Sequence, residues 1–281
     1  MRIIADSGST KTHWVLTGPE DLRKDFHSEG INPHFMEAAT IESVAATAVP
    51  GEIRNEVTEL VFYGAGCAGS EKCALVHSAL QKVFPRARIA TNSDLLAAAH
   101  ALLGKAAGVA CILGTGSNAA VYDGETFTQR ITSLGYMLGD EGSGSYIGRR
   151  LLQACFRKEM PETLRDAFFA RFDLSTAGLL ENIYRRPFPN RYLASFAPFA
   201  SAHSDDDFIR ELIHSSFADF IRYQLDTLEF DKQMPVGFVG SVAFHFRDVL
   251  REELSRNNYN PGKILTEPMD ALLDFYDQNL G

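Results

Sequence analysis

The sequence has little cysteine and lacks any long apolar run. Its four cysteines, Cys67, Cys73, Cys111 and Cys155, form no CxxC pair, and its eight histidines form no HExxH pattern, so spacing supports neither zinc nor redox chemistry. No apolar run approaches the roughly 20 residues that span a bilayer. Met1 leads directly into a strand-like segment without the apolar core of a signal peptide. These absences predict a cytoplasmic protein with no membrane partner.

Positive charge is also in short supply. The chain has 27 Lys and Arg against 36 Asp and Glu, which gives a net charge of -9. This balance argues against a general nucleic-acid or anionic-membrane binder. The composition, with 45% hydrophobic and 22% charged residues, is that of an ordinary globular protein, and 281 residues favour two domains over one.

One short pattern occurs twice, about a hundred residues apart. An apolar run, a loop rich in glycine and hydroxyl groups, and a β-prone run occupy residues 3–16, and the same order recurs at residues 109–122. Aligned by eye, IADSGST at residues 4–10 matches ILGTGSN at residues 112–118. The repetition predicts two lobes of similar design.

The remaining periodicities predict further elements. Short apolar runs indicate strands, and apolar residues spaced by three and four indicate helices. The expected strands are residues 59–63, 87–91 and 236–239, and the expected helices are residues 37–48, 71–84, 93–103, 208–225, 242–255 and 269–277.

The first loop could hold phosphate, but it is not a Walker A motif, because Lys11 and Thr12 lack the upstream glycine and precede a strand. Backbone N–H groups of such a hairpin can still face phosphate oxygens, Thr10 can donate a hydroxyl hydrogen bond, and Asp6 can hold Mg²⁺ through water. The second loop, residues 114–118, has no acid. An ordinary tight turn remains the alternative for each loop.

A different nucleotide motif competes with these loops. Residues 64–69 read GAGCAG, follow an apolar run and precede a helical pattern, and Asp94 lies downstream. This matches the dinucleotide-binding fingerprint. A Rossmann fold starting there would leave the first sixty residues unexplained.

Taken in order, the segments ADSGSTKT, EGINPH, TNSD, LGTGSN, GYMLGDEGSGSYIG and VGSV resemble the N-acetylglucosamine kinase-like branch of the BadF/BadG/BcrA/BcrD ATPase family, within the actin/hexokinase/Hsp70 superfamily. The resemblance implies an α/β fold of two RNase H-like lobes with a central nucleotide and sugar cleft. Residues 1–104 would form the first lobe, with the terminal helix 268–281 packed back on it, and residues 105–267 the second lobe with a helical insert.

The resemblance also implies ATP and Mg²⁺ as cofactors and assigns roles to residues. Asp94 matches the catalytic base, although without the resemblance a helix cap is the better explanation, and capping is also the alternative for Asp140. The nucleotide would contact Asp6, Gly8, Ser9, Thr10, Lys11, Thr115, Gly116, Ala202, Gly240 and Ser241. Asp6 would also hold the Mg²⁺ ion, through water. The sugar would contact Asn32, Ser117, Asn118, Gly135, Tyr136 and Asp140.

The implied reaction is transfer of phosphate from ATP to the 6-hydroxyl of an amino sugar, with N-acetylglucosamine as the expected substrate. An activator ATPase of the radical dehydratase type, which holds an iron–sulfur cluster, and a non-catalytic sugar sensor are the alternatives. A homodimer is left open. The chain departs from the family where a glycine-rich turn should enter the last helix, because residues 267–272 read EPMDAL.

Overall fold

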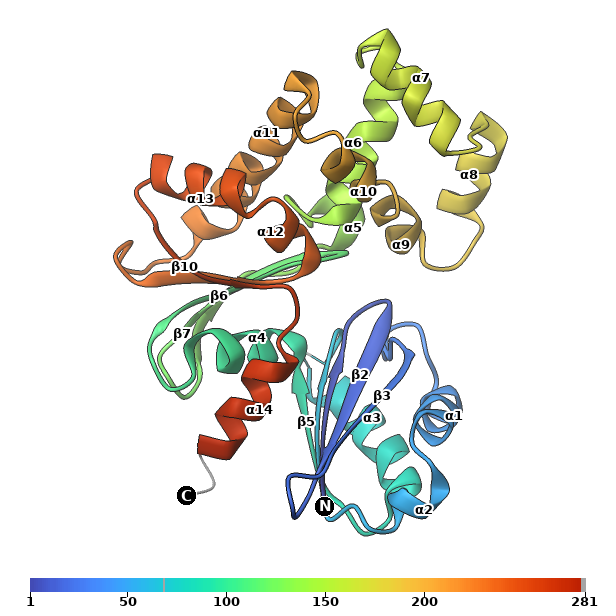
Figure 1. The fold of residues 1–281 in the computed structure, drawn as a ribbon, viewed down its shortest axis with the longest axis vertical. Coiled ribbons are helices and arrows are strands. Elements are labelled where there is room, and N and C mark those ends of the chain that lie inside the picture. The colour runs from blue at the N-terminus through green and yellow to red at the C-terminus, as the bar shows by residue number, and fades with distance from the viewer. Residues whose placement is uncertain (68, 279–281) are drawn as a thin grey trace. The chain divides into compact units, whose positions relative to one another are not determined.

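A computed structural model describes residues 1–67 and 69–278. The chain divides into two compact units (Figure 1). The first contains Met1–Gly104 and the segment that starts at Glu267, and the second contains Lys105–Thr266. Ala68 of the GAGCAG segment and residues 279–281 of the expected terminal helix lie outside the described residues.

The first unit is built on a five-stranded mixed sheet with the order β3-β2-β1-β4-β5. The first three strands form antiparallel hairpins, and β1, β4 and β5 run parallel. Their bounds are β1 (Arg2–Ser7), β2 (Lys11–Thr17), β3 (Arg23–Glu29), β4 (Glu59–Gly64) and β5 (Arg88–Ser93).

Helices cover both faces of this sheet, because alternate residues of its central strands are apolar on both sides. Ile3 and Ala5 of β1 join the core with Trp14 and Phe62, whereas Ile4 between them points to the opposite face. Helix α14 contacts both α4 and β1, so the end of the chain packs within the first unit. The helices are α1 (Ala38–Ala48), α2 (Gly51–Arg54), α3 (Ser70–Val83), α4 (Asp94–Leu103) and α14 (Met269–Gln278).

The second unit repeats this topology. Its sheet has the order β10-β9-β6-β7-β8, with two antiparallel hairpins and parallel pairing of β6, β9 and β10. The strands are β6 (Gly108–Leu113), β7 (Ser117–Tyr122), β8 (Phe127–Arg130), β9 (Pro235–Val239) and β10 (Asn260–Leu265).

The strand ladders change the alignment of the two loops. Ser7 pairs with Thr12 at the end of the first hairpin, and Leu113 pairs with Ser117 at the end of the second. Ser7 therefore corresponds to Leu113, whereas the alignment by eye set it against Thr115. Ser117 and Asn118 consequently belong to β7, not to the loop.

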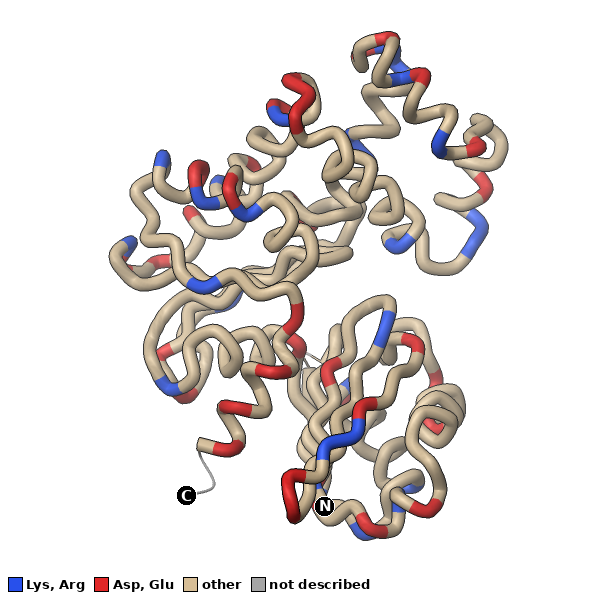
Figure 2. The backbone as a smooth tube through the Cα atoms, in the orientation of Figure 1, with Lys and Arg blue, Asp and Glu red and all other residues tan. Residues whose placement is uncertain are grey.

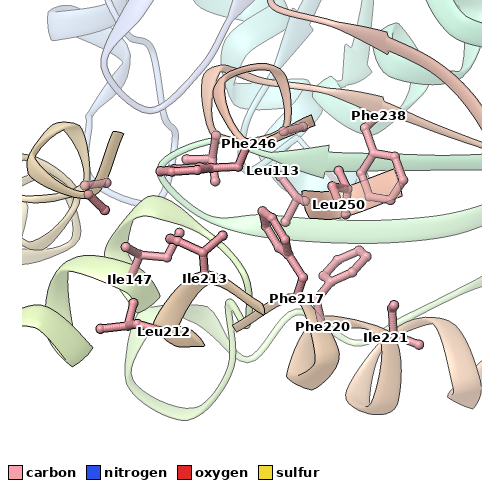
Figure 3. Packing of buried hydrophobic residues seen from close by; sticks show 14 of the residues in the cluster. Leu113, Ile147, Leu212, Ile213, Phe217, Phe220, Ile221, Phe238, Phe246 and Leu250 are labelled. Carbon is pink, nitrogen blue, oxygen red and sulfur yellow. The ribbon is translucent and has the colours of Figure 1, made fainter. Parts of the chain in front are cut away.

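The helices of the second unit pack mainly through aromatic and aliphatic side chains. Figure 3 shows Phe217, Phe220 and Ile221 of α11 directed toward Leu113 and Phe238 of the sheet. These residues belong to the apolar stripe that the sequence predicts. The helices are α5 (Gly135–Leu138), α6 (Gly144–Phe156), α7 (Glu162–Arg171), α8 (Thr176–Tyr184), α9 (Pro189–Ala194), α10 (Ala197–Ala202), α11 (Asp207–Tyr223), the 3-10 turn η1 (Leu225–Thr227), α12 (Ser241–His245) and α13 (Arg247–Arg256).

Three sequence predictions in this unit are wrong or incomplete. The single helix expected at residues 242–255 is two helices, which break at the buried residue Phe246. Strands β8 and β10 have no predicted counterpart, because each lies at the edge of the sheet and neither is a continuous apolar run; β10 contains Pro261 and Gly262.

Charged residues of both signs are interspersed along the chain, as Figure 2 shows for α11 and α13. The excess of acidic residues is therefore shared among many elements. Within residues 1–67 and 69–278, no helix has the length and apolar character that crossing a membrane requires.

Candidate functional site

Two acidic residues lie at one edge of the first sheet. Asp6 is the penultimate residue of β1, and Asp94 follows the last residue of β5. Because β1, β4 and β5 are parallel and in register from Asp6 through Tyr63 to Asn92, their carboxyl ends share an edge. In open α/β sheets this edge is where ligands bind.

Asp94 is not the cap of its helix. The cap of α4 is Ser93, whose hydroxyl accepts a hydrogen bond from the Leu96 N–H at 3.3 Å. Asp94 is the first helical residue, and its Oδ1 accepts from the Leu95 N–H at 2.9 Å. Burial raises the pKa of the Asp94 carboxyl to about 6, despite the opposing effect of backbone N–H groups. The capping alternative is therefore wrong, and a half-buried carboxylate that could accept a proton near neutral pH remains.

Asp6 has a still more perturbed carboxyl group. Burial raises its pKa to about 7, and the negative charges of Asp94 and Glu267 add to the rise, while Lys11 opposes it. A divalent cation at this position would hold the carboxyl in its ionised form. The described residues contain no group of three or more His, Cys, Asp or Glu side chains suited to a metal ion. Asp6 could hold an ion there only as expected from the sequence, through water, which is how Mg²⁺ binds where few protein oxygens are offered.

The loop between β1 and β2 is held from beneath by buried hydroxyl groups. The Ser7 and Thr12 hydroxyls are hydrogen-bonded at 2.7 Å, and Ser7 also accepts from the Ile31 N–H at 2.8 Å. Gly30 packs directly against the loop, because a Cβ at this position would lie 2.3 Å from the Gly8 carbonyl oxygen. Ser7 and Thr12 are thus occupied structurally.

The outer part of this loop remains accessible. Thr10 and Lys11 are exposed, and Ser9 is half-buried. The Lys11 ammonium pairs with Glu267, which lies in the segment entering α14, and the Glu267 carboxylate is 4.0 Å from His13 Nδ1. The segment that departs from the family pattern therefore brings an acidic side chain to the first loop.

Asn32 also lies at this edge of the sheet. Its Oδ1 accepts from the His34 N–H at 3.0 Å, and a Cβ on Gly66 would lie only 2.5 Å from the same oxygen. Gly66 has a φ of 82° and follows Ala65, whose N–H bonds the Ser7 carbonyl at 2.9 Å. Gly66 of the GAGCAG segment therefore serves this close approach. With two antiparallel hairpins preceding β4, the Rossmann alternative is wrong.

The second loop is joined to the start of α6. The Gly144 N–H bonds the Gly114 carbonyl at 2.8 Å, and the Ser145 N–H bonds the Thr115 carbonyl at 3.1 Å. A Cβ on Gly116 would lie 3.0 Å from the Asp140 carboxylate, so a glycine at this position leaves room for Asp140.

Asp140 anchors this group of residues. Its Oδ1 accepts from the Ser117 N–H at 3.2 Å, and its backbone is left-handed with a φ of 56°. Burial raises the pKa of Asp140 to about 6, the Ser117 N–H opposes the rise, Glu141 adds to it and Arg149 opposes it. The hypothesis that Asp140 caps a helix is wrong, since Ser143 caps α6. Asp140 is a second perturbed carboxyl beside a glycine-rich loop.

The other proposed residues of the second unit fall into two groups. Gly240 joins the loop, because its φ is 133° and a Cβ there would lie 2.2 Å from the Leu113 carbonyl oxygen; exposed Ser241 follows it. Asn118 points its Oδ1 at the Ala119 N–H at 3.0 Å.

Gly135 and Tyr136 lie on one helix and Ala202 on another. Gly135 and Tyr136 form the start of α5, where Arg149 donates to the Tyr136 carbonyl at 3.1 Å. Ala202 is the exposed last residue of α10. The structure thus connects the loop residues and Asp140 through hydrogen bonds and close contacts, while Ala202 has only a methyl group to offer.

Sequence reasoning missed several residues of these groups. Glu141 stands next to Asp140 in the GDEGS segment and could have been found there. Gln224, which donates to Ser117 and Glu141, carries no local signal because its partners lie 107 and 83 residues away. Glu267 was noted only as a departure from the family pattern.

Comparison with solved structures finds a close relative of this chain. No family model and no curated protein matches the chain. A solved structure described as "Putative N-acetylglucosamine Kinase" from Porphyromonas gingivalis is 37% identical, covers all of both chains and superposes with a TM-score of 0.94.

Two more distant structures share the fold. A protein described in the same words from Chromobacterium violaceum is 17% identical over 98% of each chain, with a TM-score of 0.65. A ROK family glucokinase from Streptomyces griseus, solved with glucose and AMPPNP, is 14% identical over 100% of this chain and 99% of its own, with a TM-score of 0.63. The two-lobed α/β fold expected from the sequence is confirmed. The chain belongs to the N-acetylglucosamine kinase-like family of the Porphyromonas gingivalis protein.

Proposed function

We propose that this protein is an ATP-dependent sugar kinase that phosphorylates an amino sugar, with N-acetylglucosamine as substrate and its 6-phosphate as product. The observation that carries the proposal is the 37% identity over the whole chain to the protein described as a "Putative N-acetylglucosamine Kinase". The perturbed carboxyls at the sheet edge support it, because phosphoryl transfer needs a carboxylate that orients the attacking hydroxyl.

In this proposal Asp94 accepts the proton of the sugar hydroxyl as that oxygen attacks. Its raised pKa makes the carboxylate a stronger base than an ordinary aspartate while leaving it ionised at pH 7. Its short bond to the Leu95 N–H holds one oxygen in place, so the other can face the hydroxyl. Asn32 and Asp140 would hold further sugar hydroxyls, since amide and carboxylate groups suit them.

The two loops contact phosphate in this proposal. Thr10 would donate its hydroxyl, and Lys11 would exchange its exposed ion pair with Glu267 for a phosphate oxygen. An exposed pair of this kind contributes at most about 1 kcal/mol, so the exchange costs little. Thr115 and the N–H of Gly116 would do the same from the second loop. Asp6 would hold Mg²⁺ through water, and the ion supplies charge neutralisation on the phosphates.

The two alternative functions gain no support from particular side chains. Cys111 and Cys155 are buried in the core of the second unit, where thiols pack as small apolar groups, and the Cys73 thiol donates to the Cys67 carbonyl. A sugar sensor without activity would have no use for a perturbed carboxyl at Asp94. The kinase is therefore the function that these residues fit best.

Activity measurements test the proposal directly. ATP consumption would be followed with N-acetylglucosamine, glucosamine, N-acetylmannosamine and glucose at equal concentrations, and the product phosphate located by NMR. Phosphorylation of N-acetylglucosamine at the 6-hydroxyl with the highest kcat/KM is expected. Absence of turnover with every sugar would refute the kinase, and equal turnover of glucose would refute the substrate.

A further inference from the structure

A one-turn helix, α5, precedes Asp140, and its own residues contribute little to its stability. None of its four residues is buried, and Leu134 before it provides no side-chain cap. The Gly139 N–H bonds the Gly135 carbonyl at 2.8 Å. A single turn fixes several backbone dihedral angles for very few hydrogen bonds, so it is unfavourable in isolation. Contacts from outside α5 must therefore hold it in place.

Arg149 of α6 supplies such a contact. It is the residue directly after the GYMLGDEGSGSYIG segment. Its Nη1 donates to the carbonyl of Tyr136 at 3.1 Å and to the carbonyl of Met137 at 3.2 Å. Carbonyls in the last turn of a helix have no partner within that helix, and arginine side chains pair well with them. One side chain of α6 thus holds the end of α5.

Arg149 also acts on Asp140 through its charge. Burial raises the pKa of Asp140 to about 6, Glu141 adds to the rise, and the Ser117 N–H and the Arg149 guanidinium oppose it. Asp140 has a left-handed backbone with a φ of 56°, which few residues other than glycine adopt. Loss of Arg149 would therefore loosen the turn before Asp140 and favour the protonated form of its carboxyl group.

Arg149 is itself held by a neighbour on α6. Its guanidinium carbon lies 5.0 Å from the centroid of the Tyr146 ring, which is a favourable cation–π distance. The Tyr146 hydroxyl donates to Asp219 Oδ2 of α11 at 2.6 Å. Burial and the contact with Asp219 raise the pKa of Tyr146, so its hydroxyl keeps the proton that it donates. These contacts connect α11 through α6 to α5.

We propose that Arg149 is a positioning residue of the sugar site, which holds α5 and the segment after it in the geometry in which Asp140 binds a sugar hydroxyl. The proposal rests on the proposed function, in which Asp140 contacts the sugar. Arg149 acts through Asp140 and takes no part in phosphoryl transfer. Its loss should therefore affect sugar binding more than turnover.

Arg149→Met removes the charge and both hydrogen bonds. In the free protein, hydrogen exchange should become at least about tenfold faster at the Gly139 N–H of α5 and at the Ser117 N–H, which bonds Asp140 Oδ1. The KM for N-acetylglucosamine should rise about tenfold while kcat changes less than about threefold, because ground-state binding is lost and Asp94 is untouched.

The pH dependence of sugar binding separates positioning from packing. Calorimetry without nucleotide should show that the wild type loses affinity near pH 6, as Asp140 becomes protonated. Arg149→Met should move this midpoint to higher pH, because the opposing positive charge is gone. Arg149→Lys keeps the charge and should restore the midpoint. Asp94 is the same in all three proteins, so the difference between them reports Asp140.

Arg150→Met is the matched control. The Arg150 guanidinium carbon lies 5.9 Å from the centroid of the same Tyr146 ring, but its Nη1 donates to the Leu212 carbonyl at 3.3 Å and to Ser216 Oγ at 3.0 Å of α11. This variant should keep the wild-type KM, pH midpoint and exchange of α5. If it changes them as strongly as Arg149→Met does, the effect belongs to α6 in general and the proposal fails.

Tyr146→Phe keeps the test decisive if Arg149→Met does not fold, because it removes only the hydroxyl that bonds Asp219. It should accelerate exchange of α5 and raise KM by smaller factors. Unchanged exchange, or faster exchange with unchanged sugar affinity and pH midpoint, would overturn the positioning role and leave the kinase standing. Sugar binding with the expected shifts but without phosphorylation would refute the kinase and leave the positioning role standing.

Discussion

Replacing Asp94 by asparagine should make the protein more stable and much less active. The pKa of about 6, against an ordinary value of 3.8, corresponds to at most about 3 kcal/mol that ionisation of this carboxyl costs the folded state. Asparagine keeps the size and the acceptor for the Leu95 N–H, and Ser93 still caps α4. The substitution removes the buried charge of Asp94 and keeps its hydrogen bond. The free energy of unfolding at pH 7 should therefore rise by about 1–3 kcal/mol.

Turnover should change in the opposite direction. Asparagine cannot accept a proton, and loss of a general base typically lowers kcat by about 10²-fold or more. Sugar binding measured by calorimetry should be largely retained. The wild type should show an acid limb in its kcat/KM profile near pH 6, below which the Asp94 carboxyl of the free protein is protonated.

The stabilising effect of Asp94→Asn should depend on pH. Because folding raises the pKa of Asp94, the cost of its ionisation is fully present above about pH 6 and disappears as pH falls towards the unfolded value near 4. The difference in the free energy of unfolding between Asp94→Asn and the wild type should therefore be smaller at pH 5 than at pH 7. Chemical denaturation at the two pH values would measure it.

Asp123 provides the contrast. Its pKa is lowered because its carboxylate accepts from the N–H groups of Thr126 and Glu125 in an exposed turn. Asp123→Asn should weaken the fold slightly and leave turnover intact. A destabilised Asp94→Asn variant, or one with near-normal kcat, would refute the reasoning about Asp94.

Three further outcomes are expected. Thr10→Val and Thr115→Val should each weaken MgATP binding or slow transfer and leave sugar affinity without nucleotide nearly unchanged, as separate calorimetric titrations would show; an effect on sugar alone would mean that the loops are wrongly assigned. Gly30→Ala should weaken MgATP binding by displacing the first loop, since its Cβ would lie 2.3 Å from a loop carbonyl oxygen, and normal MgATP affinity would contradict that role. Glu267→Gln should lower the pKa of Asp6, because the Glu267 charge helps to raise it, so Mg²⁺ binding by the free protein should persist to lower pH, and an unshifted pH midpoint for Mg²⁺ binding would separate Glu267 from the site.

The order of the chemical motifs and the two-lobed plan can be predicted from the sequence alone. Strands β1, β4, β6 and β9 are short apolar runs, and the loops after β1 and β6 are rich in glycine and hydroxyl groups, so both are legible from neighbouring residues. The apolar stripe of α11 is equally local. Such features depend on side chains only a few positions apart, which is why pattern and spacing suffice to predict them.

Tertiary structure decided the properties that depend on distant residues. Whether Asp94 caps a helix or keeps a perturbed carboxyl depended on Ser93 taking the cap and on burial at the sheet edge. Lys11 pairs with Glu267, which is 256 residues away in the sequence, and Gln224 donates a hydrogen bond to Ser117, which is 107 residues away. The equivalence of Ser7 with Leu113 followed from strand pairing, which side-chain similarity misplaced by two residues. The burial of a side chain and the charges that shift its pKa depend on every residue packed around it. Neighbouring residues in the sequence cannot predict them.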